Sequence, residues 1–155
     1  MASLTTSHQV LVRPVLRNDA EAVADIHIAA RGAAPMPPSV HAEAAVRAWL
    51  AQRVQKDEVW VAVDGDAVVG YVRFTDEWLE DLYIAPSHAR LGIGTKLLDV
   101  VKRRRPAGFS LWVFEMNAPA RAFYGGHGLM ECEHRDGADN EERTPDLRMA
   151  WVPGR

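Results

Sequence analysis

Residues 59–74 place the strongest constraint on the fold. Their sequence, VWVAVDGDAVVGYVRF, has two runs rich in β-branched and aromatic residues on either side of Asp64, Gly65 and Asp66. An Asp-Gly pair suits the positive φ values of a tight turn, so the segment predicts an antiparallel β-hairpin. The fold therefore includes antiparallel strand pairing.

The rest of the chain alternates between strand-like and helix-like segments, which predicts a mixed α/β (α+β) layer fold. Further strands are expected at 10–16, 78–85, 109–114, 129–134 and 147–152, and helices at 20–30, 39–55, 95–105 and 119–124. Asp19 is the expected N-cap of the first helix, and the three prolines within 32–38 predict a loop after it. Residues 136–144 form a polar connection between the last two strands.

The length allows one well-filled core, because a chain of 155 residues buries roughly 69% of the surface that its unfolded form exposes. We expect a loose tail over residues 1–8 and a single domain over 9–155. Apolar residues make up 48% of the chain, and no apolar stretch approaches the ~20 residues that span a bilayer. The first residues lack a signal-peptide pattern, so a cytoplasmic location without a membrane partner is predicted.

Charge and cysteine content argue against several function classes. Lys and Arg number 18 against 21 Asp and Glu, which makes nucleic acid an unfavourable main partner. Cys132 is the single cysteine and lies between two glutamates, so we expect no intrachain disulfide and an inert thiol. The six histidines show no metal-ligand spacing, so no metal site is predicted.

Two glycines mark a loop between the strand at 78–85 and the helix at 95–105. The loop reads Arg90-Leu91-Gly92-Ile93-Gly94-Thr95, and it presents free backbone N–H groups at the positive end of a helix dipole. Such an arrangement binds anions, above all phosphate. The spacing fits neither a Walker loop nor a GxGxxG fingerprint. A tight turn without a ligand is the alternative.

Asn117 and Tyr124 form a second candidate pair. Asn117 is the expected N-cap of the short helix at 119–124, and Tyr124 follows seven residues later, roughly 10 Å along the axis. Both could touch one long, thin ligand. The alternative is a simple cap and a half-buried core tyrosine.

The segments LEDLYIAPSHARLGIGTKLL (79–98) and NAPARAFYGGHGL (117–129) together resemble the acetyl-CoA core of the GNAT N-acetyltransferase superfamily. The resemblance implies a GNAT-like acyl-CoA N-acyltransferase fold, with a mixed, mostly antiparallel twisted sheet flanked by helices. The strands at 78–85 and 109–114 would run parallel and splay apart to admit the cofactor. One departure is that Ala89 and Arg90 stand where the family usually has Gln or Arg, followed often by Gly.

The resemblance also implies the activity and the site. An acetyl group would pass from acetyl-CoA to a primary amine by direct attack in a ternary complex. Position by position, it implies that the pantetheine arm pairs with the main chain of Leu82, Tyr83 and Ile84. The pyrophosphate would bind in a cradle formed by Arg90, Leu91, Gly92, Ile93, Gly94 and Thr95. Asn117 would contact the arm through its side-chain amide, and Tyr124 would donate a proton to the departing thiolate.

The attacking amine must also lose a proton, for which a carboxylate is the usual device. Glu80 is the first candidate, because it matches a position where some relatives carry a base. The glutamate that other members place five residues before the asparagine is replaced by Trp112. The remaining carboxylate candidates are Glu77, Asp81 and Glu115. A solvated strand-end carboxylate is the alternative interpretation of Glu80.

The resemblance places the acceptor between the loop at 31–38 and the connection at 136–144. Carboxylates facing the pocket would favour a cationic acceptor, either a small-molecule amine or a protein or peptide amine; the second segment carries Asp136, Asp139, Glu141 and Glu142. An acyl-CoA-binding module without catalysis is the first alternative. A tRNA acetyltransferase is another, favoured only by the basic run at 102–105, which we interpret as helix-dipole complementation. Whether the chain forms a homodimer is left open.

Overall fold

The computed structural model describes residues 9–154, which form two β-sheets and four α-helices. The predicted tail over residues 1–8 lies outside the described residues. The first sheet has the order β1 (Leu11–Pro14), β2 (Glu58–Asp64), β3 (Ala67–Phe74), β4 (Leu79–Ile84), and the second the order β5 (Phe109–Phe114), β7 (Asp146–Trp151), β6 (Met130–Arg135), with all neighbours antiparallel. The predicted hairpin is β2–β3, and Gly65 in its turn has φ +60°.

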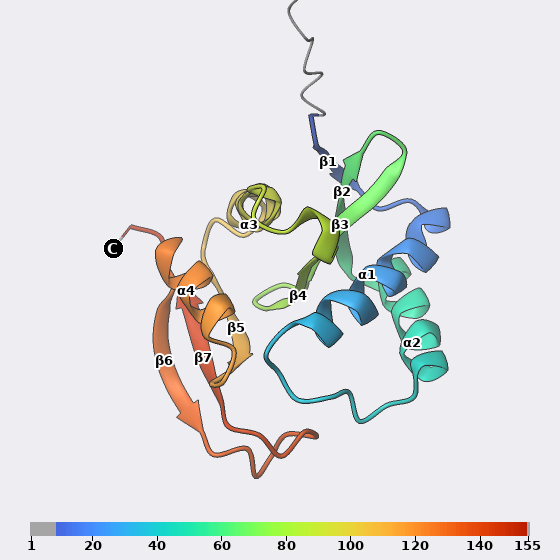
Figure 1. Ribbon diagram of the computed structural model, residues 1–155. Helices are drawn as coiled ribbons and strands as arrows, with labels where there is room; N and C mark the ends of the chain where they lie inside the picture. Colours follow the sequence, from blue (N-terminus) through green and yellow to red (C-terminus); the bar gives the residue numbers. More distant parts are fainter. Residues whose placement is uncertain (1–8, 155) are drawn as a thin grey trace, which may run out of the picture.

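Helices cover both faces of the first sheet (Figure 1). On one face, α1 (Ala20–Ala33) packs against β3 and β4 and carries α2 (Glu43–Lys56) beside it. On the other, α3 (Ile93–Arg104) packs against β2, β3 and β4. The remaining helix, α4 (Ala118–Gly126), packs against β6 of the second sheet. The predicted mixed fold class, with helices flanking mostly antiparallel sheets, is confirmed.

Two apolar clusters hold these layers together, and alternate residues of the central strands divide between them. Val72 faces the larger cluster beneath α3, whereas Tyr71 faces the smaller one beneath α1. On β4, Leu82 and Ile84 pack toward the larger cluster and Tyr83 toward the smaller one. Strand β4 is therefore fixed from both faces.

The outer edge of β4, unlike its two faces, is largely uncovered. Among the described residues, β4 and β5 are joined by one parallel bridge, Trp78 to Ser110, and by the Ser110 N–H bond to the Glu77 carbonyl at 2.9 Å. Beyond this point the strands belong to separate sheets, each as an edge strand. The parallel direction and the splay that the resemblance implied are both present.

Several predicted boundaries were wrong. Helix α1 continues through Gly32 to Ala33, because one glycine costs only about 1 kcal/mol in a helix and the first proline comes at Pro35. Helix α2 begins at Glu43, not at Ser39, because the Ser39 hydroxyl accepts the His41 N–H and forms a local turn first. The glycines expected to follow the short helix lie inside α4.

Asp19 occupies the N-cap position of α1, but its side chain does not cap the helix. Its carboxylate accepts hydrogen bonds from Arg13 on β1 and from the Leu16 N–H, both at 2.7 Å. The hydrogen bond from Arg13 lowers the pKa of the Asp19 carboxyl. The side chain therefore joins the first strand to the start of α1.

Candidate active site

A cavity of about 510 Å³ lies where β4 and β5 separate. Its walls come from α1, α2, the connection between them, β4, β5, α4 and the β6–β7 connection. Of the predicted site residues, it brings together Glu80, Leu82, Tyr83, Asn117 and Tyr124. Among the other carboxylate candidates, Asp81 lines the cavity, whereas Glu77 and Glu115 do not.

Ile84 and residues 90–95 are not part of the cavity wall. The loop makes its turn with two left-handed residues, Arg90 at φ +64° and Gly92 at φ +79°. Helix α3 then begins at Ile93, and the N–H groups of its first turn have no acceptor within the helix. A Cβ at Gly94 would lie 3.2 Å from the Phe123 ring, so a side chain here would press on α4.

His127 joins the first turn of α3 to the end of α4. Its Nε2 lies 2.9 Å from the Thr95 hydroxyl, and its Nδ1 lies 2.8 Å from the Phe123 carbonyl. His127 is the C-cap residue of α4. The Thr95 side chain is engaged here, so only its main chain is free for the predicted anion cradle.

The basic run at 102–105 is largely engaged inside the molecule. Lys102 donates to the His127 carbonyl at 2.7 Å, and Arg104 and Arg105 pair with Glu58 at 2.6 and 3.2 Å. These contacts support its interpretation as a structural run at a helix C-terminus.

Asn117 and Tyr124 present their polar atoms from α4. The Asn117 Oδ1 accepts the Ala120 N–H at 3.3 Å, which confirms the predicted N-cap. Tyr124 is 8% exposed, and its ring meets Phe123 edge-on at 5.2 Å. Its hydroxyl has no hydrogen-bond partner among residues 9–154, and it is not sealed from solvent. Burial raises the pKa of Tyr124, so the phenol stays protonated at neutral pH.

Glu80 projects from β4 with an exposed side chain, and its Oε1 lies 3.5 Å from the Thr75 hydroxyl. Partial burial raises the pKa of its carboxyl; Arg73 opposes this shift and the charge on Asp81 adds to it. The carboxylate therefore binds a proton more readily than one in water. This direction suits a base, whereas the attraction of a cationic group depends on the charged carboxylate.

Below the cavity lies a buried polar network that sequence reasoning missed. His27 Nδ1 lies 2.7 Å from the Tyr71 hydroxyl, which donates to Asp81 at 3.1 Å. Arg73 donates to the same carboxylate oxygen at 2.7 Å and to Asp57 at 2.7 Å. The one available signal was the spacing of His27 and Arg31, four residues apart, but the predicted helix ended at residue 30; the observed helix α1 puts both side chains on one face.

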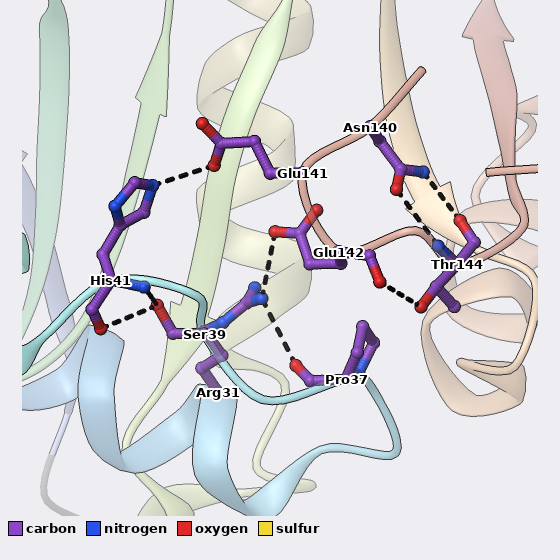
Figure 2. Close-up of polar contacts among 8 residues, drawn as sticks. All are labelled: Arg31, Pro37, Ser39, His41, Asn140, Glu141, Glu142 and Thr144. Atoms are coloured by element: carbon purple, nitrogen blue, oxygen red, sulfur yellow. Dashed lines mark hydrogen bonds and ion pairs between the residues drawn. The ribbon is translucent and has the colours of Figure 1, made fainter. Parts of the chain in front are cut away.

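The opposite rim of the cavity is closed by two pairs between distant segments (Figure 2). Arg31 donates from Nη2 to the Pro37 carbonyl at 3.3 Å and to Glu142 at 3.4 Å. His41 Nε2 lies 2.9 Å from a Glu141 carboxylate oxygen. Of the four predicted acceptor-site carboxylates, Glu141 and Glu142 line the cavity and Asp136 and Asp139 do not.

The segment that carries these glutamates has its own internal support. The Asn140 amide donates to the Thr144 carbonyl at 2.6 Å and accepts the Thr144 N–H at 3.1 Å (Figure 2). Figure 1 shows this connection and the α1–α2 connection at the same end of the molecule. The rim is therefore formed by the β6–β7 connection, which its own hydrogen bonds hold in place and which contacts α1 and the α1–α2 connection across the cavity.

Comparison with known proteins agrees with this architecture. A family model described as the acetyltransferase (GNAT) domain matches residues 55–128. The peptidyl-lysine N-acetyltransferase YiaC of Escherichia coli K12 is 30% identical over 95 residues, which are 59% of this chain. The aligned chain spans 62% of YiaC, just under two thirds of its length.

Solved structures extend the likeness to almost the whole chain. The apo form of YjaB from Escherichia coli superposes with a TM-score of 0.75 at 21% identity, covering 93% of this chain and 98% of YjaB. YncA from Salmonella typhimurium, solved with acetyl-CoA, gives a TM-score of 0.72 at 21% identity and covers 95% of each chain. The predicted resemblance is confirmed for the fold, which these solved structures share, and residues 55–128 match the GNAT acetyltransferase domain.

Two further findings concern residues 9–154. No helix within this range has the length and apolar character needed to cross a membrane. The same residues contain no group of three or more His, Cys, Asp or Glu side chains placed to hold a metal ion.

Proposed function

We propose that this protein is an acetyl-CoA-dependent N-acetyltransferase that acts on a primary amine in a ternary complex. The observation that carries the proposal is the cavity between two unpaired strand edges, which Tyr124 lines from α4 and Glu80 from β4. The match of the family model supports it, because residues 55–128 include every predicted catalytic and cofactor-binding residue. The proposal includes a cytoplasmic location and no metal or membrane partner.

The residues present fit the cofactor. The free edge of β4 offers the main-chain donors and acceptors of Leu82 and Ile84 to the amides of a pantetheine arm, whereas the main chain of Tyr83 faces Tyr71 on β3. The loop from Arg90 to Thr95 offers first-turn N–H groups to a pyrophosphate. Asn117 offers its side-chain amide from the cavity wall. Acetyl-CoA would supply the activated acetyl thioester.

Residues of the chain are proposed to carry out the two proton transfers, to the departing thiolate and from the acceptor amine. The Tyr124 hydroxyl, kept protonated by burial, is proposed to give its proton to the departing thiolate. The Glu80 carboxylate is proposed to draw in the ammonium form of the acceptor and is the sequence-based candidate for the base. Glu141 and Glu142 add negative charge at the rim, which favours a cationic acceptor.

A thiol-release assay with acetyl-CoA and a panel of amines tests the proposal. We expect release with cationic acceptors, beginning with lysine-containing peptides, because YiaC is a peptidyl-lysine N-acetyltransferase. A polyamine and an amino sugar extend the panel, and acetylated lysine peptides are the matched control. Acetyl-CoA at 100 times its Kd should also stabilise the fold by about 2.7 kcal/mol.

Two outcomes would contradict this function. Stabilisation by acetyl-CoA with no thiol release for any amine would favour a binding module without catalysis. Co-purification of RNA, with acetylation of that RNA alone, would favour the tRNA-acetylating alternative.

A further inference from the structure

His27 is held in one orientation by the buried network. Its Nδ1 lies 2.7 Å from the hydroxyl of Tyr71, a residue with no exposed surface, and that hydroxyl donates to Asp81 at 3.1 Å. Arg73 fixes the Asp81 carboxylate through a 2.7 Å hydrogen bond. The ring of Tyr83 meets the imidazole edge-on, with 5.0 Å between centroids. The imidazole is therefore packed and hydrogen-bonded on one side.

The same contacts determine which ring nitrogen carries the proton. Tyr71 has one hydroxyl proton and donates it to Asp81, so its oxygen must accept from His27 Nδ1–H. A neutral His27 then has its lone pair on Nε2. This atom has no hydrogen-bond partner among residues 9–154 and is not sealed from solvent. His27 lines the cavity with Tyr83 and Tyr124, and Nδ1 is the nitrogen that faces Tyr71.

We propose that His27 Nε2 accepts the proton that the acceptor's ammonium group must lose before attack, with Tyr71 and Asp81 as positioning residues. The inference rests on the proposed function. One N–H bond of the ammonium breaks, and its electron pair stays on nitrogen as the nucleophilic lone pair. A new Nε2–H bond forms, and the imidazolium later releases the proton to water.

Three charged groups act on this imidazole from the elements packed around it. Asp81 on β4 favours the imidazolium, whereas Arg31 on α1 and Arg73 on β3 disfavour it. Burial is the largest influence and lowers the pKa of His27 below its ordinary value. The ring is therefore neutral at pH 7 and able to accept a proton, while Asp81 stabilises the charge that forms.

An imidazole is also better matched to this task than a carboxylate. An alkyl ammonium titrates near pH 10.4, an ordinary histidine near 6.5 and an ordinary glutamate near 4.3. The lowered pKa of His27 and the raised pKa of Glu80 narrow this difference, so the assignment of the base to His27 rests on its position and its hydrogen bonds. This leaves Glu80 with the attraction of the cation, a role that depends on its charge.

Kinetics of His27→Gln test the inference, with thiol release followed between pH 5.5 and 10. We expect kcat/KM to fall by about 10²-fold at pH 7 and the loss to shrink toward pH 10, where a much larger fraction of the amine is already neutral. In the wild type, kcat/KM should fall on acidification, at a lower pH than an ordinary histidine would give, because the pKa of His27 is lowered and protonated His27 cannot accept a proton. The matched control is His134→Gln on the exposed strand β6, outside the cavity, which should leave the profile unchanged.

A measurement without substrates gives a second readout. Imidazole ¹⁵N NMR of the free protein should show His27 protonated on Nδ1 and bare on Nε2 at pH 7. Tyr71→Phe should weaken that tautomer preference and lower kcat more than it raises KM. Added imidazole should restore part of the rate of His27→Ala, which a purely structural role would not allow.

The outcomes separate the two proposals. A wild-type protein that binds acetyl-CoA but acetylates no amine defeats the proposed function. Turnover by the wild type, with His27→Gln within about threefold of it at every pH, overturns the role of His27 alone. A proton found on Nε2 at neutral pH would also overturn it.

Discussion

The two sides of the cavity are built on different principles. The proposed cofactor side relies mainly on main chain, from the free edge of β4 and the first turn of α3, with the Asn117 side chain added at the N-terminal end of α4. The acceptor side uses side chains from segments far apart, such as Arg31 with Glu142 and His41 with Glu141. Main-chain contacts tolerate side-chain replacement, whereas the acceptor side changes with each substitution. The proposed function thus divides between binding by main-chain groups and binding by an adjustable set of side chains.

Gly94→Glu should break the cofactor side and have the largest effect. We expect acetyl-CoA affinity to fall more than 10²-fold, because the new carboxylate adds a negative charge where the pyrophosphate is proposed to bind. Calorimetry measures this loss. Gly94→Ala is the matched control, since it adds only the Cβ that presses on Phe123 at 3.2 Å, and it should cost a few-fold.

Ala89→Arg completes this test by restoring a side chain that the family often carries. It should leave affinity unchanged or tighten it, because the cradle is made of main-chain groups. Unchanged affinity in Gly94→Glu would instead refute the assignment of the loop.

Tyr124→Phe tests the proposed proton donor, which lies between the cofactor side and the acceptor side of the cavity. The variant keeps the ring packing and removes a hydroxyl that has no hydrogen-bond partner among the described residues, so the fold should be unaffected. We expect kcat to fall by about 10²-fold with acetyl-CoA affinity nearly unchanged. Steady-state kinetics and calorimetry together measure the split. A full-rate variant would make Tyr124 a packing residue.

Glu80→Gln tests the acceptor side alone. Loss of the charge should lower kcat/KM by about tenfold for a cationic amine, chiefly through the acceptor KM, with no change in acetyl-CoA affinity. The raised pKa of Glu80 means that its charge is lost sooner on acidification, so the difference from wild type should narrow at low pH. It should also narrow at high pH, where the amine is neutral. A profile parallel to wild type at every pH would exclude any role for Glu80 in acceptor binding or deprotonation.

Glu142→Gln is expected to give the smallest change, a two- to fivefold rise in the acceptor KM. Its pair with Arg31 spans 3.4 Å and is partly exposed, and such pairs contribute roughly 0.2–1 kcal/mol. Glu133→Gln on β6, whose carboxylate pairs with Arg148, is the matched control outside the cavity. An equal change in both variants would indicate a general charge effect and not a specific rim contact.

The difference between the two sides of the cavity also explains which features the sequence could predict. The hairpin, the bounds of β5 and the Asn117 cap follow from local turn chemistry, periodicity and capping, which act over a few residues. The order of these elements, together with the two core segments, was enough to predict the splay of β4 and β5.

The acceptor side could not be predicted in this way. The hydrogen bond from His27 to Tyr71 joins residues 44 apart, and the Arg31–Glu142 pair joins residues 111 apart. Such partners are determined by the packing of α1 on the sheet and by the shape of the β6–β7 connection. A histidine on the polar flank of an amphipathic helix gives no sequence signal of its own that it faces a buried tyrosine.

The splay between the sheets has a consequence for handling the protein. Strands β4 and β5 are both edge strands, and they face each other across the cavity with main-chain groups that no neighbouring strand pairs. Exposed edges of this kind are templates for pairing with other chains, which leads to aggregation. A ligand lying along β4 would cover one of them. Amide hydrogen exchange at Leu82 and Ile84 should therefore slow in acetyl-CoA, and preparations kept in coenzyme A should remain monodisperse for longer than ligand-free ones.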